Sequence, residues 1–195
     1  MNTFLKISLF VGLLGFVGAC TQKTVTRVNT EQQIDLSGRW NDVDSRLVAE
    51  EMSKDAINRP WREAFTQRTG KKPVMIVGMI TNKSHEHIEA ETFIKDIERE
   101  FINTATVRVV QNAEFREKMR EERADQQQFA SQETQKKWGR ELGADYMLFG
   151  NINSIVDQEG NKKVVFYQVN LELADLETNE IVWLGAKKIK KYIKN

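Results

Sequence analysis

The chain has 195 residues, with 29 basic and 28 acidic side chains, so its formal net charge is only +1. A nucleic-acid-binding protein would carry a basic excess, and this balance argues against that class. A single cysteine in the whole chain excludes an internal disulfide.

The N-terminus has the pattern of an export signal. Residues 1–6 carry one positive charge, and residues 7–19 form an apolar run that is shorter than the roughly 20 residues a membrane-spanning helix needs. The run ends in Val17-Gly18-Ala19 before Cys20, which resembles the lipobox of bacterial lipoprotein signals. An ordinary secretory signal followed by a chance cysteine is the alternative. We expect residues 1–19 to be a signal peptide and Cys20 to carry lipid.

Removal of that signal leaves equal numbers of acidic and basic residues. Residues 20–36 are polar and lack helical periodicity, so we expect a flexible, lipidated tether. About fifteen such residues reach ~50 Å when fully stretched. Residues 37–195 have the length of one globular domain, with no need of disulfides to stabilise a core.

The first half of that domain predicts alternating helices and strands. Ser37 or Asn41 opens a helix that ends at Arg59-Pro60, with Val43, Leu47, Met52, Ala56 and Ile57 on its apolar face. Residues 61–69 add a further helical turn. The nearly continuous apolar run at 74–80 indicates a central strand covered on both faces. The next predicted elements are a helix at 88–103, with Phe93, Ile94, Ile97, Phe101 and Ile102 on one side, and a short strand at 107–110.

The second half predicts two helices and then three strands. Asn112 caps a charged helix with few apolar positions, and a second helix runs from 131 to 142. Strands follow at 146–157, 163–175 and 181–193, separated by short polar turns. The predicted order is α-β-α-β-α-α-β-β-β. This pattern indicates an α/β (α+β) fold, with helices on a mixed five-stranded sheet that ends in an antiparallel three-strand meander.

Residues with catalytic or metal-binding chemistry are scarce. His85-Glu86-His87 holds both histidines of the chain, but a metal site needs a third and usually a fourth ligand. We therefore expect a solvated loop there, and no metal or cofactor. No serine has the setting of a nucleophile elbow. A hydrolase with paired carboxylates stays open as an alternative, although no particular pair stands out.

Several separated blocks resemble the LpoB family, whose members are outer-membrane lipoproteins that activate class A penicillin-binding proteins. The blocks cover nearly the whole mature chain: DLSGRWNDVDSRLVAEEM at 35–52, RPW at 59–61, VGMITNKSHEHI at 77–88, TFIKDIEREFIN at 92–103, REERADQQ at 120–127, LGADYMLFGNI at 142–152 and YQVNLELADLETNEIVW at 167–183. The block at 142–152 is also similar to the N-terminal domain of TolB and to related periplasmic modules.

This resemblance implies a non-enzymatic lipoprotein of the outer membrane that faces the periplasm, acts as a monomer and stimulates peptidoglycan biosynthesis. The expected partner is a class A penicillin-binding protein, and the process is cell-wall assembly and control of cell shape. The tether is shorter than in well-known members and has no proline. Its reach therefore requires a synthase that extends outward, or a different partner. A TolB-like envelope-assembly or glycan-binding module remains the alternative function.

The charged helix is the predicted docking surface. It has little to bury beyond Phe115, Met119 and Phe129, yet it lies in a block that carries the resemblance. We expect the partner-binding residues to be Arg116, Arg120, Glu121, Arg123 and Gln126, with the rest of the glutamine run to 128. The competing interpretation is a solvated helix whose charges pair along its own surface. The lysine-rich segment at 187–194 also has two interpretations. Lysines on an edge strand prevent aggregation, and they could also lie against an anionic cell-wall or lipid surface.

Overall fold

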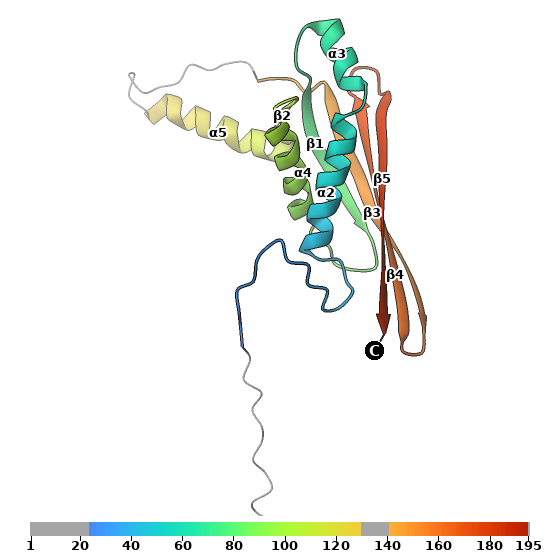
Figure 1. The fold of residues 1–195 in the computed structure, drawn as a ribbon. Coiled ribbons are helices and arrows are strands. Elements are labelled where there is room, and N and C mark those ends of the chain that lie inside the picture. The colour runs from blue at the N-terminus through green and yellow to red at the C-terminus, as the bar shows by residue number, and fades with distance from the viewer. Residues whose placement is uncertain (1–23, 130–140, 195) are drawn as a thin grey trace, which may run out of the picture. The chain divides into compact units, whose positions relative to one another are not determined.

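A five-stranded mixed sheet with helices beside it forms the body of the protein in a computed structural model that describes residues 24–129 and 141–194 (Figure 1). The chain divides into two units, residues 1–32 and residues 33–195. In the first unit, described residues 24–32 contain neither helix nor strand. The boundaries of the signal, tether and globular domain stay predictions.

The order of strands in the sheet is β2-β1-β3-β4-β5. Strand β1 (Val74–Lys83) pairs in parallel with β2 (Arg108–Val110) on one side and with β3 (Tyr146–Glu159) on the other. Strands β4 (Lys162–Asp175) and β5 (Ile181–Lys194) continue the sheet as antiparallel neighbours. This arrangement confirms the mixed sheet and its C-terminal meander.

Four helices accompany the strands: α2 (Asp42–Ile57), α3 (Trp61–Thr69), α4 (Ala90–Thr104) and α5 (Ala113–Phe129). The predicted order is confirmed over the described residues, and α3 is a full helix of nine residues rather than a single turn. It ends at Gly70, which takes a left-handed φ of 69°. Most of the helix predicted at 131–142 lies outside the described residues.

A capping box begins α2. The Asn41 side chain accepts a hydrogen bond from the Asp44 N–H at 3.0 Å, and the Asp44 carboxylate accepts one from the Asn41 N–H at 3.0 Å. Asn112 caps α5 in a similar way, because its Oδ1 accepts the N–H of Phe115 at 3.1 Å. Both helix starts therefore confirm the sequence signals.

One face of the sheet packs against α2 and α4. On β4 the alternate residues Val165, Tyr167, Val169, Leu171 and Leu173 are all buried, as their alternation predicted. The predicted helix faces were each one residue too wide. Leu47 is exposed while Val48 and Ala49 are buried, and Ile102 is exposed while Phe93, Ile97 and Phe101 are fully buried. In a helix, residues four positions apart lie on the same narrow stripe. The next residue along the chain is rotated by about 100°, so its side chain points away from that stripe.

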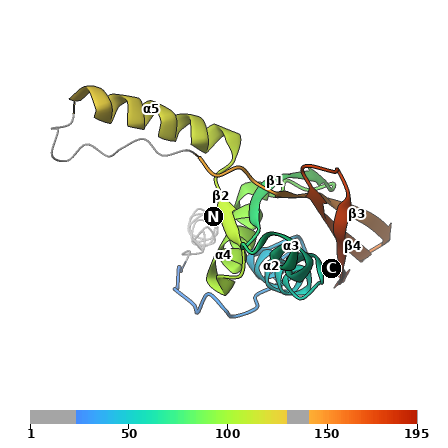
Figure 2. The same cartoon turned by 90° about the horizontal axis from the view of Figure 1, so that it is seen from above.

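Figure 2 shows α2, α3 and α4 on one side of the sheet, while no helix covers β3, β4 and β5 on the other side. We call this second surface the open face; it consists of the residues of β1, β3, β4 and β5 that alternate with the buried ones. Among the described residues, none of the helices is long and apolar enough to cross a membrane.

The segment before α2 is fastened to the last strand. Lys191 on β5 donates from Nζ to Asp35 at 2.8 Å, to Asp44 at 2.6 Å and to the backbone oxygen of Arg39 at 2.9 Å. Its side chain is only 11% exposed. This cluster joins residues that lie about 150 positions apart and fixes the start of the domain.

Candidate partner-binding site

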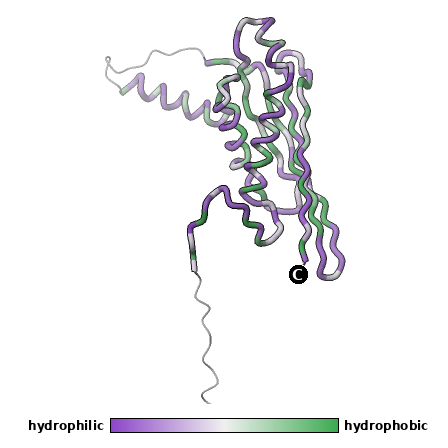
Figure 3. Tube along the Cα trace, in the orientation of Figure 1, coloured by the Kyte–Doolittle hydropathy of each residue, from purple (hydrophilic) through white to green (hydrophobic). Residues whose placement is uncertain are grey.

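Helix α5 has no buried residue in the structure, and Figure 3 shows it as mostly hydrophilic along its length. Its first turn contacts the body through Phe115, whose ring lies 5.1 Å from Lys95 Nζ on α4. A helix with so little apolar contact gains little stability from the core. Packing in the core therefore does not explain the charged side chains of this helix.

Most of those charges pair within the chain. Arg120 donates from Nε and one terminal nitrogen to the two carboxylate oxygens of Glu141, at 3.0 and 2.8 Å, and it also contacts Glu117 at 2.9 Å. Arg123 contacts Glu141 at 3.3 Å. The hydrogen bonds from Arg120 lower the pKa of Glu141, and the same contacts raise the pKa of Arg120. Much of the predicted site is thus a local ion-pair network.

The predicted site residues differ in how many of their polar groups already have a partner within the chain. Gln126 donates to Glu122 at 2.8 Å, one helical turn away. Arg116 has no ion pair within 4.0 Å among the described residues, and its Nε is buried without a hydrogen-bond partner there. Glu121 is exposed. All five residues lie on this one helix, and Arg116 is the one of its three predicted arginines that forms no ion pair among the described residues.

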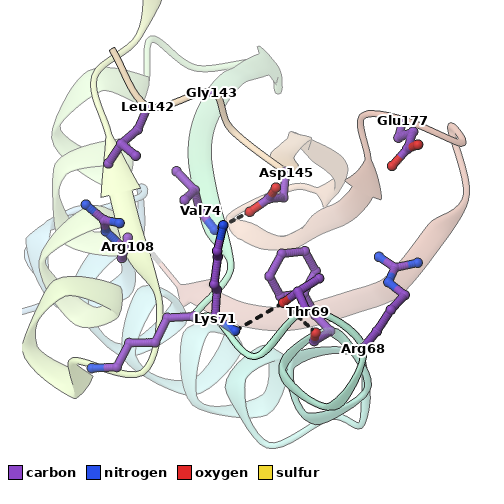
Figure 4. Close-up of a pocket in the computed structure, with 11 residues that line it drawn as sticks. Arg68, Thr69, Lys71, Val74, Arg108, Leu142, Gly143, Asp145 and Glu177 are labelled. Atoms are coloured by element: carbon purple, nitrogen blue, oxygen red, sulfur yellow. Dashed lines mark hydrogen bonds between the residues drawn. The ribbon is translucent and has the colours of Figure 1, made fainter. Parts of the chain in front are cut away.

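A basic basin of about 930 Å³ lies where strands β1, β2 and β3 begin. Figure 4 shows Arg68 and Arg108 on opposite sides of the basin, so its cations do not converge on one point. Asp145 accepts the N–H of Val74 at 2.7 Å, and Lys72 donates to the backbone oxygen of Ala105 at 2.8 Å. Both residues hold strand and helix ends together, which is a structural role.

In the His85-Glu86-His87 loop both histidines are exposed, as expected of a solvated loop, but Glu86 between them is not. The Glu86 side chain is only 9% exposed, and its two oxygens accept the Tyr167 hydroxyl at 2.8 Å and the Trp40 N–H at 3.0 Å. Burial, together with the Glu86 contact, raises the pKa of Tyr167. Trp40 and Tyr167 lie 46 and 81 positions from Glu86 in the sequence, so no local sequence pattern predicts these contacts.

Metal-binding chemistry does not assemble around this loop. Within residues 24–129 and 141–194 there is no group of three histidine, cysteine, aspartate or glutamate side chains that could hold a metal ion. His85 instead places Nδ1 2.6 Å from Ser154 Oγ. The loop therefore joins β3, β4 and the segment before α2. Cys20, the predicted lipidation site, lies outside the described residues.

Comparison with known proteins gives one family match. The profile of a family described as "Peptidoglycan-synthase activator LpoB" matches residues 44–189, well over half of the chain. A search of curated proteins found no significant match.

Solved structures with a similar arrangement include an NMR structure of E. coli LpoB, at 14% identity and a TM-score of 0.41, covering 91% of this chain and 86% of that one. The LpoB C-terminal domain from Salmonella enterica is 18% identical, with a TM-score of 0.34 and coverage of 68% and 94%. Lipoprotein GNA1162 from Neisseria meningitidis is 13% identical, with a TM-score of 0.39 and coverage of 62% and 83%. At these TM-scores the structural likeness carries no argument, and the family match carries the comparison.

Proposed function

We propose, because this chain belongs to the LpoB family of peptidoglycan-synthase activators, that it binds a class A penicillin-binding protein and stimulates it without being an enzyme itself. The observation that carries this proposal is the continuous family match over residues 44–189, which includes every strand and all four described helices in whole or in most of their length. An activator that is not an enzyme acts by contacting its partner, so the proposal depends on which surface residues make that contact.

Helix α5 is one part of the proposed docking surface. Its arginines present the planar, five-donor group that recognises carboxylates bidentately, as Arg120 already does with Glu141. A partner carboxylate would pair directly with Arg116 and would exchange with Glu141 at Arg120 and Arg123. Exchange of one exposed pair for another changes the free energy little. Arg116 is therefore the residue of α5 expected to contribute most.

The tether sets how far this surface reaches. We propose that lipid on Cys20 anchors the protein in the outer membrane, facing the periplasm. Asp35 is bound to Lys191 on the body, and the first unit ends at residue 32, so we count residues 20–32 as the length of the tether. At about 3.4 Å per residue they span ~45 Å. The proposal therefore requires a synthase with a domain that extends toward the outer membrane.

The experiment is affinity capture with the lipidated full-length chain from detergent-solubilised envelopes, followed by assays with the purified partner. We expect recovery of a bifunctional penicillin-binding protein whose glycan polymerisation rises when the chain is added. Recovery of secretion or surface-assembly components alone would contradict the proposal and favour an envelope-assembly or glycan-binding role.

Charge reversal tests the role of α5 in that complex. Arg116→Glu is expected to weaken synthase binding at least tenfold, because truncation of a central interface arginine often costs about 2 kcal/mol. Lys118→Glu, on the same helix and paired with Glu114 at 2.8 Å, is the control for general charge effects. Equal binding by wild type and Arg116→Glu, with an unchanged thermal midpoint, would make α5 a solvated helix.

A further inference from the structure

The open face carries more apolar side chains than a solvent-exposed sheet surface usually does. An antiparallel sheet with one solvated face normally alternates apolar residues inward and polar residues outward. Here many outward positions are apolar as well. They include Met79, Met147, Phe149, Ile155, Val164, Phe166, Leu184 and Tyr192.

Several of these side chains are strongly exposed. Met79 is 75% exposed, Ile155 66%, Leu184 65% and Tyr192 62%. The strand register brings outward apolar residues into neighbouring positions, because Ile155 pairs with Phe166, and Val164 pairs with Tyr192. Isolated exposed apolar residues are normal, but a contiguous group on one face marks an interaction surface.

Four amide side chains occupy the centre of the open face. Asn153 and Asn170 both donate to Asn151 Oδ1, the latter at 3.1 Å, and Gln168 donates to Asn170 Oδ1 at 2.8 Å. Asparagine is depleted in strands, so three of them on two adjacent inner strands need a reason. Among the described residues, Asn151 Nδ2 and the side-chain oxygens of Asn153 and Gln168 are left without hydrogen bonds. They remain available for a directional contact with a partner.

The lysines of β5 differ sharply between the two faces. Lys187 and Lys191 point toward α2 and are paired, the first with Glu51 and the second with Asp35 and Asp44. Lys188 and Lys190 alternate with them onto the open face. Both are exposed and form no ion pair among the described residues.

A third lysine extends this positive rim to the opposite side of the open face. Lys83 on β1 pairs in register with Asn153, and it too is exposed without an ion pair in the described part of the chain. The acidic residues that alternate onto the same face are Asp157, Glu159 and Glu172. The exposed, unpaired lysines at the two sides of the open face fit a partner with acidic residues at the edge of its contact surface.

We propose that the open face docks a protein surface with a polar centre, apolar patches beside it and acidic residues at its edge, and that this surface belongs to the synthase; the identity of the partner rests on the proposed function. Three strand spacings of about 4.8 Å and about ten residues of about 3.3 Å give a face on the order of 500 Å². That size is typical of the smaller, reversible interfaces, which bury less than about 1,200 Å² in total. The open face and α5 are separate surfaces, and each is tested by its own variants.

Two pairs of variants test the open face in the full-length chain against the purified synthase. Ile155→Glu with Leu184→Glu places charge in the apolar group, and Lys188→Glu with Lys190→Glu reverses the rim. The matched controls are Ile102→Glu, which alters an apolar residue 58% exposed on α4, and Lys71→Glu on the loop after α3. We expect at least a tenfold rise in Kd for each open-face pair and less than a twofold change for each control.

Thermal unfolding checks each variant. If the Ile155/Leu184 pair does not fold, the Lys188/Lys190 pair still carries the test, because both lysines are exposed and free of ion pairs among the described residues. Equal binding by wild type and a folded open-face variant would overturn this inference and leave the proposed function intact. Failure of the wild type to bind any synthase would overturn both.

Two further results would overturn the inference by identifying a different occupant. One is a wild-type dimer in sedimentation that becomes monomeric in Leu184→Glu, since a second copy would then cover the face. The other is loss of binding to soluble cell-wall glycan fragments in the open-face variants while their synthase binding is unchanged.

Discussion

Lys191→Met is predicted to destabilise the domain more than any other single charge removal on β5. Methionine keeps the apolar stem but removes an ammonium that three oxygens accept. Asp44, whose side chain is 10% exposed, would keep its bond from the Asn41 N–H but lose its cation. Removal of one member of a buried ion pair costs about 3–5 kcal/mol. Because some exposure remains, we expect about 3 kcal/mol.

Urea unfolding followed by circular dichroism measures this loss, and a loss of that size lowers the thermal midpoint by about 6–12 °C in a domain of this length. Lys188→Met, the exposed neighbour on the open face, is the matched control and is expected to change stability by less than about 0.5 kcal/mol. A Lys191→Met loss equal to that of the control would refute the reasoning that this cluster fastens the start of the domain to β5.

The same cluster predicts a pH dependence. The hydrogen bond from Lys191, with a second from Gln33, holds the pKa of Asp35 below its ordinary value of 3.8. A carboxyl group whose pKa is lowered by folding stabilises the fold above its unfolded pKa and loses that stabilisation as the pH falls. Burial lowers the pKa of Lys191, but its bonds to Asp35 and Asp44 outweigh burial and raise it above 10.5. The stability difference between wild type and Lys191→Met should therefore shrink below about pH 4 and again above about pH 10.5.

Three other predictions concern separate parts of the molecule. The hydrogen bond from Trp183 Nε1 at 2.8 Å is the main cause of the lowered pKa of Asp55, so Trp183→Phe should weaken the loss of stability on acidification between neutral pH and pH 3; an unchanged acid profile would contradict this. In Gly150→Ala the new Cβ would lie 2.1 Å from a backbone oxygen of β4, which predicts a loss of about 1–3 kcal/mol in urea unfolding, whereas Gly143→Ala meets nothing within 4 Å and should be silent. Cys20→Ser should move the protein from the membrane fraction to the soluble fraction, and equal membrane association would end the lipidation proposal.

The fold could be predicted from sequence wherever a local pattern decides the structure. Strand β4 alternates cleanly, and Asn41 and Asn112 cap helices through bonds to residues three positions away. Helix α3 was underestimated because Trp61 and Phe65 are its only buried residues, and its partner Tyr146 comes from a distant strand.

The candidate site was less predictable because its features depend on distant contacts. Arg120 and Arg123 find Glu141 about twenty positions along the chain, so the sequence showed the charges without their pairing. Glu86 is buried by Trp40 and Tyr167. Likewise, the apolar residues of β3 on both of its faces look like an ordinary buried strand until the helices are seen on one side alone.

The most direct test of the central claim measures the rate of glycan polymerisation by a purified class A penicillin-binding protein with and without this chain. We predict a saturable increase in rate on addition of the full-length chain, at concentrations that match its measured Kd, and a loss of that increase in the Lys188→Glu/Lys190→Glu variant. An unchanged polymerisation rate at concentrations of the chain that saturate the synthase would contradict the activator function.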